Sequence, residues 1–342
     1  MFFLNKISHR MKIITCLFVI YLPFMLLSQG FTKNEIERYK KQSQNVTIIR
    51  DNFGVPHIYG KTDADAVFGL LYAQCEDDFK RVELNYIEKL GRKSEIYGEK
   101  ELYNDLLIKM LIDTTEAKMD YKKAPKWLKK LCEAFADGIN YYMYTHPENQ
   151  SMLIKKFEPW YPFLWTDGSI GAINTSDMSA RDLRSFYGQE IAMSFDYHIN
   201  NDPLEEKLTG SNGFAFAPHR TTSGSAILYI NPHVTFYFRP EVHMVSEEGL
   251  NAYGAVTWGQ FFIYQGFNEN CGWMHTSSAV DAADTYIEMI RKTDNGYEYA
   301  YNGQWQKIKT KKITIDIVNN NQKQAKTFEA LYTHHGPIMG KE

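Results

Sequence analysis

The sequence predicts an α+β fold in which helices dominate before Ser211 and strands dominate after it. Apolar residues recur at helical spacing over 63–90, and residues 105–111 and 127–144 show the same amphipathic pattern. Beyond Ser211, short runs of β-branched and aromatic residues alternate with turn residues, which is typical of strands. The 342 residues suffice for one large domain or two ordinary ones.

The first 30 residues have the pattern of a secretory signal. Lys6, Arg10 and Lys12 precede a charge-free apolar run at 13–27. This run is short for a membrane anchor and contains a proline, so an anchor is the weaker alternative. We therefore expect a signal peptide at 1–30 and a secreted, periplasmic protein without stable membrane insertion.

Composition excludes some functions. The net charge is −3, which argues against a nucleic-acid partner because such a partner requires a basic face. Outside the signal, Cys75, Cys132 and Cys271 are odd in number and widely spaced, so they predict no disulfide framework. We interpret them as small buried apolar residues.

The elements are expected in the following order. Residues 35–44 form a short helix or a linker, 46–50 form a strand rich in β-branched residues, and 51–58 form a turn-rich segment. The helix at 63–90 ends at a glycine, and 167–194 is helical although its glycines weaken the pattern. The later strands are expected at 214–217, 226–230, 234–238, 253–258, 261–264, 285–291, 297–301 and 313–318.

The sequence Gly210-Ser211-Asn212-Gly213 follows an acidic, loop-like stretch at 200–207. Alone it is a turn sequence, because Ser and Asn readily bond their own backbone. Further blocks follow in order: Asn231-Pro232-His233, then Gly266 and Asn268, then Trp273, Thr276, Asp281 and Asp284. Their order, more than any single block, indicates a functional site.

This ordered set resembles the penicillin acylase family of N-terminal nucleophile hydrolases, whose precursor is cut at a Gly-Ser-Asn junction. Segment 50–58 resembles the family's opening Arg-Asp-x-aromatic-Gly-Val-Pro-His-Ile signature. The resemblance implies an αββα sandwich with an α-subunit region at 31–199, a spacer at 200–210 and part of a β subunit at 211–342. Family β subunits are several times longer, so we expect a truncated chain with little turnover of its own.

One departure from the family pattern bears on the substrate. Segment 73–78 reads Ala-Gln-Cys-Glu-Asp-Asp where the family often has Ala-x-Asp-Arg. This points away from the best-known penicillin-cleaving members and towards the group that includes acyl-homoserine-lactone and lipopeptide acylases. The implied activity is removal of an acyl group from a small-molecule amide by an α/β heterodimer made from one precursor.

The resemblance also implies the roles of individual residues. Cleavage after Gly210 would free Ser211 as nucleophile, with its own α-amino group as base. The backbone N–H of Ser277 would donate to the oxyanion, and His233 would stabilise it by main chain or ring.

A structural calcium ion is the implied cofactor. Its ligands would be the carboxylates of Glu190, Asp281 and Asp284, with the carbonyl of Ala283 between the last two. The alternatives are a charged helix face at Glu190 and a solvated turn at 281–284.

Two other interpretations remain open. A separate Ser-His-Asp triad could use His57 or His233, but the chain lacks a Gly-x-Ser-x-Gly elbow, and in the family His57 belongs to scaffold. The chain could instead be a non-catalytic secreted relic that only binds a ligand.

Overall fold

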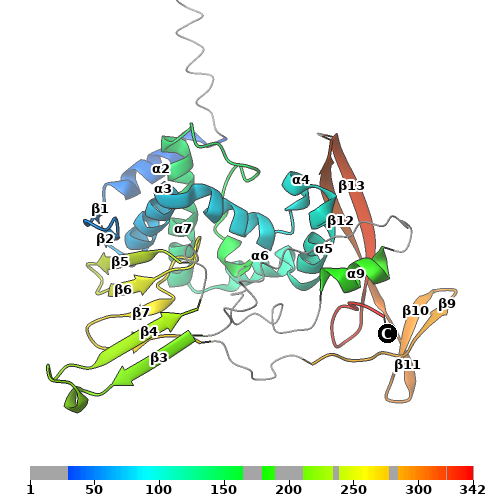
Figure 1. Cartoon of the computed structure of the whole chain (residues 1–342). Coiled ribbons are helices and arrows are strands. Elements are labelled where there is room, and N and C mark those ends of the chain that lie inside the picture. The colour runs from blue at the N-terminus through cyan, green and yellow to red at the C-terminus, as the bar shows by residue number, and fades with distance from the viewer. Residues whose placement is uncertain are drawn as a thin grey trace, which may run out of the picture.

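The computed structural model describes residues 30–164, 179–188, 211–233, 239–276, 284–320 and 322–341. These ranges contain both helices and strands, which confirms the α+β prediction (Figure 1). Almost all of the predicted signal lies outside them. Within these ranges, no helix combines the length and apolar character needed to cross a membrane.

A six-stranded sheet is the largest sheet in the described residues, and its order is β1-β2-β5-β6-β7-β8. The strands are β1 (Val46–Arg50), β2 (Pro56–Gly60), β5 (Glu241–Ser246), β6 (Asn251–Ala255), β7 (Gln265–Phe267) and β8 (Gly272–Trp273). Neighbouring strands are antiparallel except β2 and β5, which run parallel with His57 opposite His243. One sheet therefore joins segments that lie far apart in the sequence.

Three helices, α2 (Lys33–Ser43), α3 (Asp63–Lys89) and α7 (Lys126–Thr145), pack with this sheet into the main hydrophobic core. Two glycines allow α3 to pack closely on the sheet and α7 to pack closely on α3. A Cβ at Gly69 of α3 would come within 2.6 Å of Val46 Cγ1, and a Cβ at Gly138 of α7 would overlap the carbonyl oxygen of Phe68. The described residues thus supply one sheet and one helical layer of the expected sandwich.

Helix α3 confirms the predicted helix at 63–90 but is not continuous. Thr62 caps its start in a reciprocal capping box with Asp65. Asp78 leaves the helical conformation, with φ −156° and ψ 75°. Its carboxylate accepts hydrogen bonds from Arg81 N at 3.0 Å and Arg81 Nε at 2.9 Å, so it caps the second half of the helix.

A second group of elements surrounds a long hairpin, β12 (Lys309–Asn319) and β13 (Gln322–Tyr332). Helices α4 (Ser94–Tyr97), α5 (Leu102–Leu111) and α9 (Ala180–Tyr187) lie beside it, and Leu106, Leu183 and Phe328 form part of its core. A three-stranded sheet adjoins it, with β9 (Ile290–Thr293), β10 (Gly296–Tyr301) and β11 (Gln304–Lys307). The remaining helices in the described residues are η1 (Glu99–Glu101), α6 (Thr114–Lys123), η2 (Tyr161–Leu164) and η3 (Pro218–Arg220).

Several predicted elements need correction. Residues 35–44, 105–111 and 127–144 correspond to α2, α5 and α7, while only 179–188 of the predicted 167–194 helix is described. The strand expected at 261–264 is wrong: this apolar run is a loop that leads into β7 and buries Ile263 and Tyr264.

The other corrections concern strand limits. The strand expected at 253–258 ends at Ala255, and the one expected at 285–291 begins only at Ile290. Residues 234–238 lie outside the described part. Strands β2, β5, β7, β8, β11 and β13 and helices α4 and α6 were not expected.

Candidate functional site

Ser211 is the first residue of a two-stranded hairpin, β3 (Ser211–Phe216) and β4 (Ile227–Pro232). The strands pair antiparallel with Ser211 opposite Pro232 and Asn212 opposite Asn231. His233 therefore follows directly after the residue that faces the candidate nucleophile. The predicted Ser-Asn and Asn-Pro-His blocks meet because the chain between them folds back as a hairpin.

The ring of His233 is held by the residue next to Ser211. Asn212 Nδ2 lies 3.0 Å from His233 Nε2. An amide NH₂ group only donates, so Nε2 is the acceptor in this contact and the ring proton is on Nδ1. The ring thus has a partner on the strand that begins with Ser211, and the predicted histidine lies at the candidate site.

Segment 272–276 crosses the same end of the hairpin. The hydroxyl of Thr276 donates to the carbonyl oxygen of Ser211 at 3.0 Å. A Cβ on Gly213 would overlap the Met274 side chain, and one on Gly272 would come within 2.5 Å of Leu228 Cδ2. The glycines thus permit close packing, which brings the Trp-x-x-Thr block to the Ser-Asn block.

The roles of Asn212 and Thr276 as hydrogen-bonding partners were not predicted. Asn212 was expected only as part of the junction, and Thr276 only as a motif position. The sequence did contain information on Asn212, because an antiparallel hairpin places this residue near Asn231 and His233. It contained none on the Thr276 hydrogen bond, because 65 residues separate Thr276 from Ser211.

Several predicted site residues lie outside the described residues: Gly210, Ser277, Glu190, Asp281 and Ala283. Asp284 is described and exposed. Calcium takes six to eight oxygen ligands, of which one carboxylate supplies at most two. Of the four predicted ligands, only Asp284 lies in the described residues. One carboxylate cannot by itself make up the coordination that calcium needs.

The hairpin exposes a row of aromatic and aliphatic side chains. Phe214, Phe216, Ile227 and Tyr229 are 46–56% exposed, and the rings of Phe214 and Tyr229 lie 5.9 Å apart. Successive residues of a strand point to opposite faces. The Phe214 and Phe216 side chains therefore share a face with Asn212 and lie opposite the side chain of Ser211.

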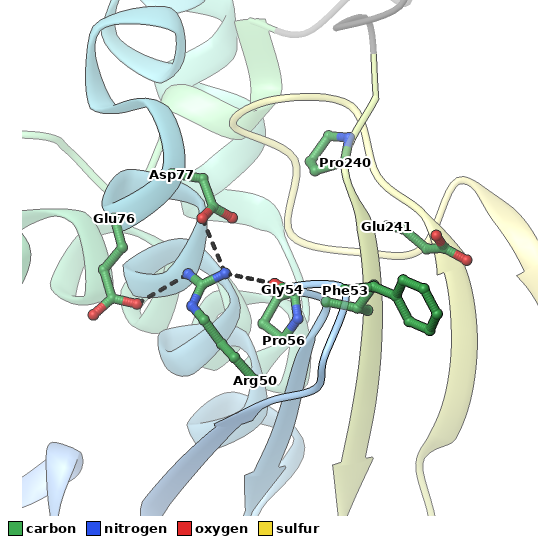
Figure 2. Close-up of a pocket in the computed structure, with 9 residues that line it drawn as sticks. Arg50, Phe53, Gly54, Pro56, Glu76, Asp77, Pro240 and Glu241 are labelled. Atoms are coloured by element: carbon green, nitrogen blue, oxygen red, sulfur yellow. Dashed lines mark hydrogen bonds and ion pairs between the residues drawn. The ribbon is translucent and has the colours of Figure 1, made fainter.

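The opening segment 50–58 is scaffold in this structure (Figure 2). Arg50 forms ion pairs with Glu76 at 3.1 Å and with Asp77 at 2.9 Å, and it donates to the carbonyl of Gly54 at 2.9 Å. Asp51 Oδ1 accepts from the backbone N–H groups of residues 53 and 55 at 2.8 and 2.9 Å. The signature thus fixes one turn and attaches it to α3 beside the Asp78 interruption.

A shallow hollow of about 670 Å³ lies at this turn, lined by Arg50, Phe53, Asp77 and Glu241 among others. None of the predicted catalytic residues lines it. Arg50 is already engaged there in ion pairs with both Glu76 and Asp77, which hold the turn against α3. The hollow is therefore separate from the candidate site at Ser211.

His57 lies in β2 and is bound on both sides of its ring. Its Nδ1 is 2.9 Å from His243 Nδ1, and its Nε2 is 3.7 Å from Asp51 Oδ2. His243 Nε2 in turn lies 2.9 Å from Asn251 Oδ1. This network joins β2 to β5 and β6, which agrees with the expected scaffold role.

Comparisons with known proteins bear on the family resemblance that the sequence motifs indicate. A family model described as penicillin amidase matches residues 45–342. The acyl-homoserine lactone acylase QuiP of Pseudomonas fluorescens is 23% identical over 89% of this chain and 42% of its own length. The penicillin acylase 2 proenzyme of Pseudomonas sp. strain SE83 is 22% identical over 87% of this chain and 44% of its own length.

Among solved structures, the thermostable penicillin G acylase from Alcaligenes faecalis aligns at 15% identity with a TM-score of 0.34. The alignment covers 41% of this chain and 80% of that chain. A score of this size does not establish a shared fold. The chain spans less than half the length of the curated relatives named above.

Proposed function

The chain belongs to the penicillin amidase family, and from that premise we propose that Ser211 is the nucleophile of a self-processing amide hydrolase. The observation that carries the proposal is the position of Ser211 at the first residue of β3, with Pro232 opposite it, His233 next to Pro232, and the Thr276 hydroxyl donating to the Ser211 carbonyl. Cleavage before Ser211 would leave its hydroxyl and a new α-amino group at the end of an ordered strand.

The α-amino group is the base in this proposal. A serine hydroxyl is a poor nucleophile until a neighbouring group accepts its proton. An α-amino group has a pKa near 7.7–8.0, so part of it is neutral at working pH, whereas an amide nitrogen is not a base. The uncut chain therefore lacks the base, and cleavage before Ser211 creates it. A bridging water would carry the proton along the short path from the hydroxyl.

The reaction follows from these groups. The Ser211 oxygen attacks the carbonyl carbon of the substrate amide, and the resulting oxyanion is stabilised by the backbone N–H of Ser277 and by His233. His233 would contribute by its main chain or by its ring, whose Nε2 contacts Asn212. Collapse of the intermediate expels the amine, which takes the proton held by the α-amino group, and water then hydrolyses the acyl ester, releases the acid and restores the Ser211 hydroxyl. Each oxyanion donor is worth about 2.7–4 kcal/mol in such reactions.

The substrate class we propose is a small-molecule amide such as an N-acyl-homoserine lactone, a β-lactam side chain or a lipopeptide. The names of the relatives support the first two. We further propose that the mature protein is an exported heterodimer. Glu190, Asp281, Asp284 and the carbonyl of Ala283 would hold one structural calcium ion, whose removal by a chelator should lower the melting temperature.

Processing is tested on the protein with its natural sequence and on Ser211→Ala and Ser211→Cys. Intact mass and N-terminal sequencing should show a new terminus at Ser211 in the natural protein and only precursor for Ser211→Ala. Ser211→Cys should retain processing in part, because a thiol is also a nucleophile. Ser223→Ala, an exposed serine at the hairpin turn, is the matched control and should be processed normally.

Two results would count against the proposal. Cleavage at 210–211 in Ser211→Ala would mean that another protease makes the cut. A natural protein that stays uncut and hydrolyses no acyl anilide would favour the non-catalytic relic instead.

A further inference from the structure

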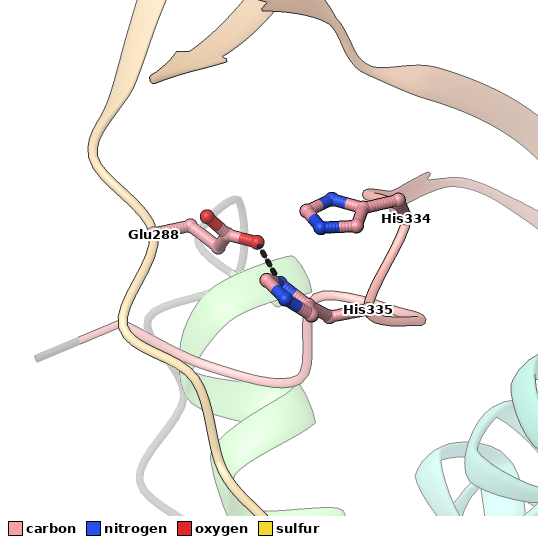
Figure 3. A group of neighbouring side chains, drawn as sticks. All are labelled: Glu288, His334 and His335. Carbon is pink, nitrogen blue, oxygen red and sulfur yellow. Dashed lines mark hydrogen bonds and ion pairs between the residues drawn. The ribbon is translucent and has the colours of Figure 1, made fainter. Parts of the chain in front are cut away.

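Glu288, His334 and His335 form a cluster away from the candidate hydrolase site (Figure 3). Glu288 lies in the segment before β9, and the two histidines lie in the turn that follows β13. One ligand atom from each side chain lies within 4.8 Å of the other two. Two imidazoles and one carboxylate are a ligand set that suits divalent transition metals.

The first pair is close to metal-ligand spacing and is now joined by a proton. His335 Nδ1–H donates to Glu288 Oε1 at 2.9 Å, and a metal ion would displace this proton from Nδ1. Zinc binds nitrogen and oxygen ligands at about 2.0–2.2 Å, so neighbouring ligands of a tetrahedral ion lie roughly 3.3 Å apart. This pair would need to open by only a few tenths of an ångström to admit an ion between its atoms.

The second histidine is oriented by a buried tyrosine. The Tyr299 hydroxyl donates to Gln306 Oε1 at 2.9 Å and lies 2.9 Å from His334 Nδ1. Its single proton is used on Gln306, so the tyrosine oxygen accepts from His334 Nδ1–H. His334 Nε2 then carries the free lone pair, so this nitrogen is available to a metal ion. Tyr299 is 3% exposed, so this support is fixed by packing.

The other ring is held as well. Tyr286 stacks on His335 with ring centroids 3.8 Å apart and an interplanar angle of 3°. The backbone of the turn is closed by Thr333 N–H donating to the carbonyl of Gly336 at 2.9 Å. The histidines themselves remain exposed, which leaves room for water as a fourth ligand.

We propose that Glu288, His334 and His335 bind one divalent transition-metal ion of the zinc class, with water completing the coordination. Calcium and magnesium do not fit, because these ions prefer all-oxygen ligand sets. A bound ion would link the segment before β9 to the turn after β13. This site uses none of the residues assigned to amide hydrolysis, so each proposal can be tested independently of the other.

The test is titration of the metal-free protein, produced without a histidine tag, with Zn²⁺ in a calorimeter and with Co²⁺ in a spectrophotometer. We expect one ion per chain, visible Co²⁺ bands of a four-coordinate centre and a higher melting temperature with Zn²⁺. His334→Ala and Glu288→Gln should each lower the affinity about tenfold or more, since even loss of a supporting partner costs about 10–100-fold.

Two variants separate this site from general surface binding. Tyr299→Phe keeps the buried ring but removes the hydroxyl that orients His334, and it should weaken Zn²⁺ binding by about 10–100-fold. His219→Ala removes an exposed histidine of the β3–β4 hairpin and should leave the affinity unchanged. Absence of Zn²⁺ and Co²⁺ binding, or equal affinity in the natural protein and in folded His334→Ala, would overturn the proposal.

Discussion

Replacing Gln74 with leucine tests how α3 holds the loop at 258–260. Gln74 is 1% exposed; its Nε2 donates to the carbonyl of Gln260 at 2.9 Å, and its Oε1 accepts from Gly259 N–H at 2.8 Å. Leucine has a similar size but no polar atom, so the packing is largely kept while both hydrogen bonds are lost. The buried N–H of Gly259 and the buried carbonyl of Gln260 then lose their hydrogen-bond partner.

The expected cost follows from those two groups. An unsatisfied buried donor or acceptor costs about 1–3 kcal/mol, so Gln74→Leu should lower the free energy of unfolding by about 2–6 kcal/mol. That is a large part of the roughly 5–15 kcal/mol of a typical protein. Urea unfolding followed by tryptophan fluorescence measures it, because Trp258 lies in the affected loop.

The matched control is Gln304→Leu, an exposed glutamine on β11, which should change the stability by no more than about 0.5 kcal/mol. A folded Gln74→Leu protein that loses less than about 0.5 kcal/mol would refute the reasoning. The loop would then owe its position to the other contacts of α3, and the two hydrogen bonds would contribute little.

Three further predictions concern other contacts. Gly138→Ala should destabilise the protein by about 1–3 kcal/mol in urea unfolding, because the new methyl group meets the carbonyl of Phe68 and the roughly 1 kcal/mol gained in helix propensity does not compensate. Thr276→Val should slow processing about 2- to 10-fold by removing a hydrogen bond of about 0.5–1.5 kcal/mol, with Thr276→Ser restoring the rate. The hydrogen bond from Lys156 lowers the pKa of Glu35 to about 2, so this carboxylate stabilises the fold above pH ~4.5 and loses that effect as the pH falls towards about 2. The stability advantage of the natural protein over Glu35→Gln, about 1 kcal/mol at neutral pH, should shrink over that range; an advantage independent of pH would contradict the assignment.

The sequence was most informative where the pattern was local. Helices α3 and α7 could be predicted because their buried faces repeat at helical spacing. The break at Asp78 could not, since two consecutive aspartates are compatible with a helix and only the contact with Arg81 shows that one of them is a cap. Strand β5 did carry a readable alternation, with Val242 and Met244 buried between more exposed neighbours.

Elements that depend on distant partners were harder to predict. β13 is polar over its first half, and its conformation depends on pairing with β12. The loop at 261–264 is as apolar as a strand, so composition could not distinguish the two. At the candidate site, the hairpin made the meeting of Ser211 and His233 predictable. The hydrogen bond from Thr276 depends on segment 272–276 crossing the hairpin, which the sequence does not encode in any local pattern.

The six-stranded sheet is built from both sides of the proposed cut. β1 and β2 precede Ser211, β5 to β8 follow it, and the parallel pair β2–β5 joins the two groups. Breaking the peptide bond before Ser211 would interrupt the covalent chain but none of these strand pairings. Unfolding of the cut protein would then release two molecules instead of one. Its melting temperature should rise with protein concentration, as for an obligate dimer, whereas that of the uncut precursor should not.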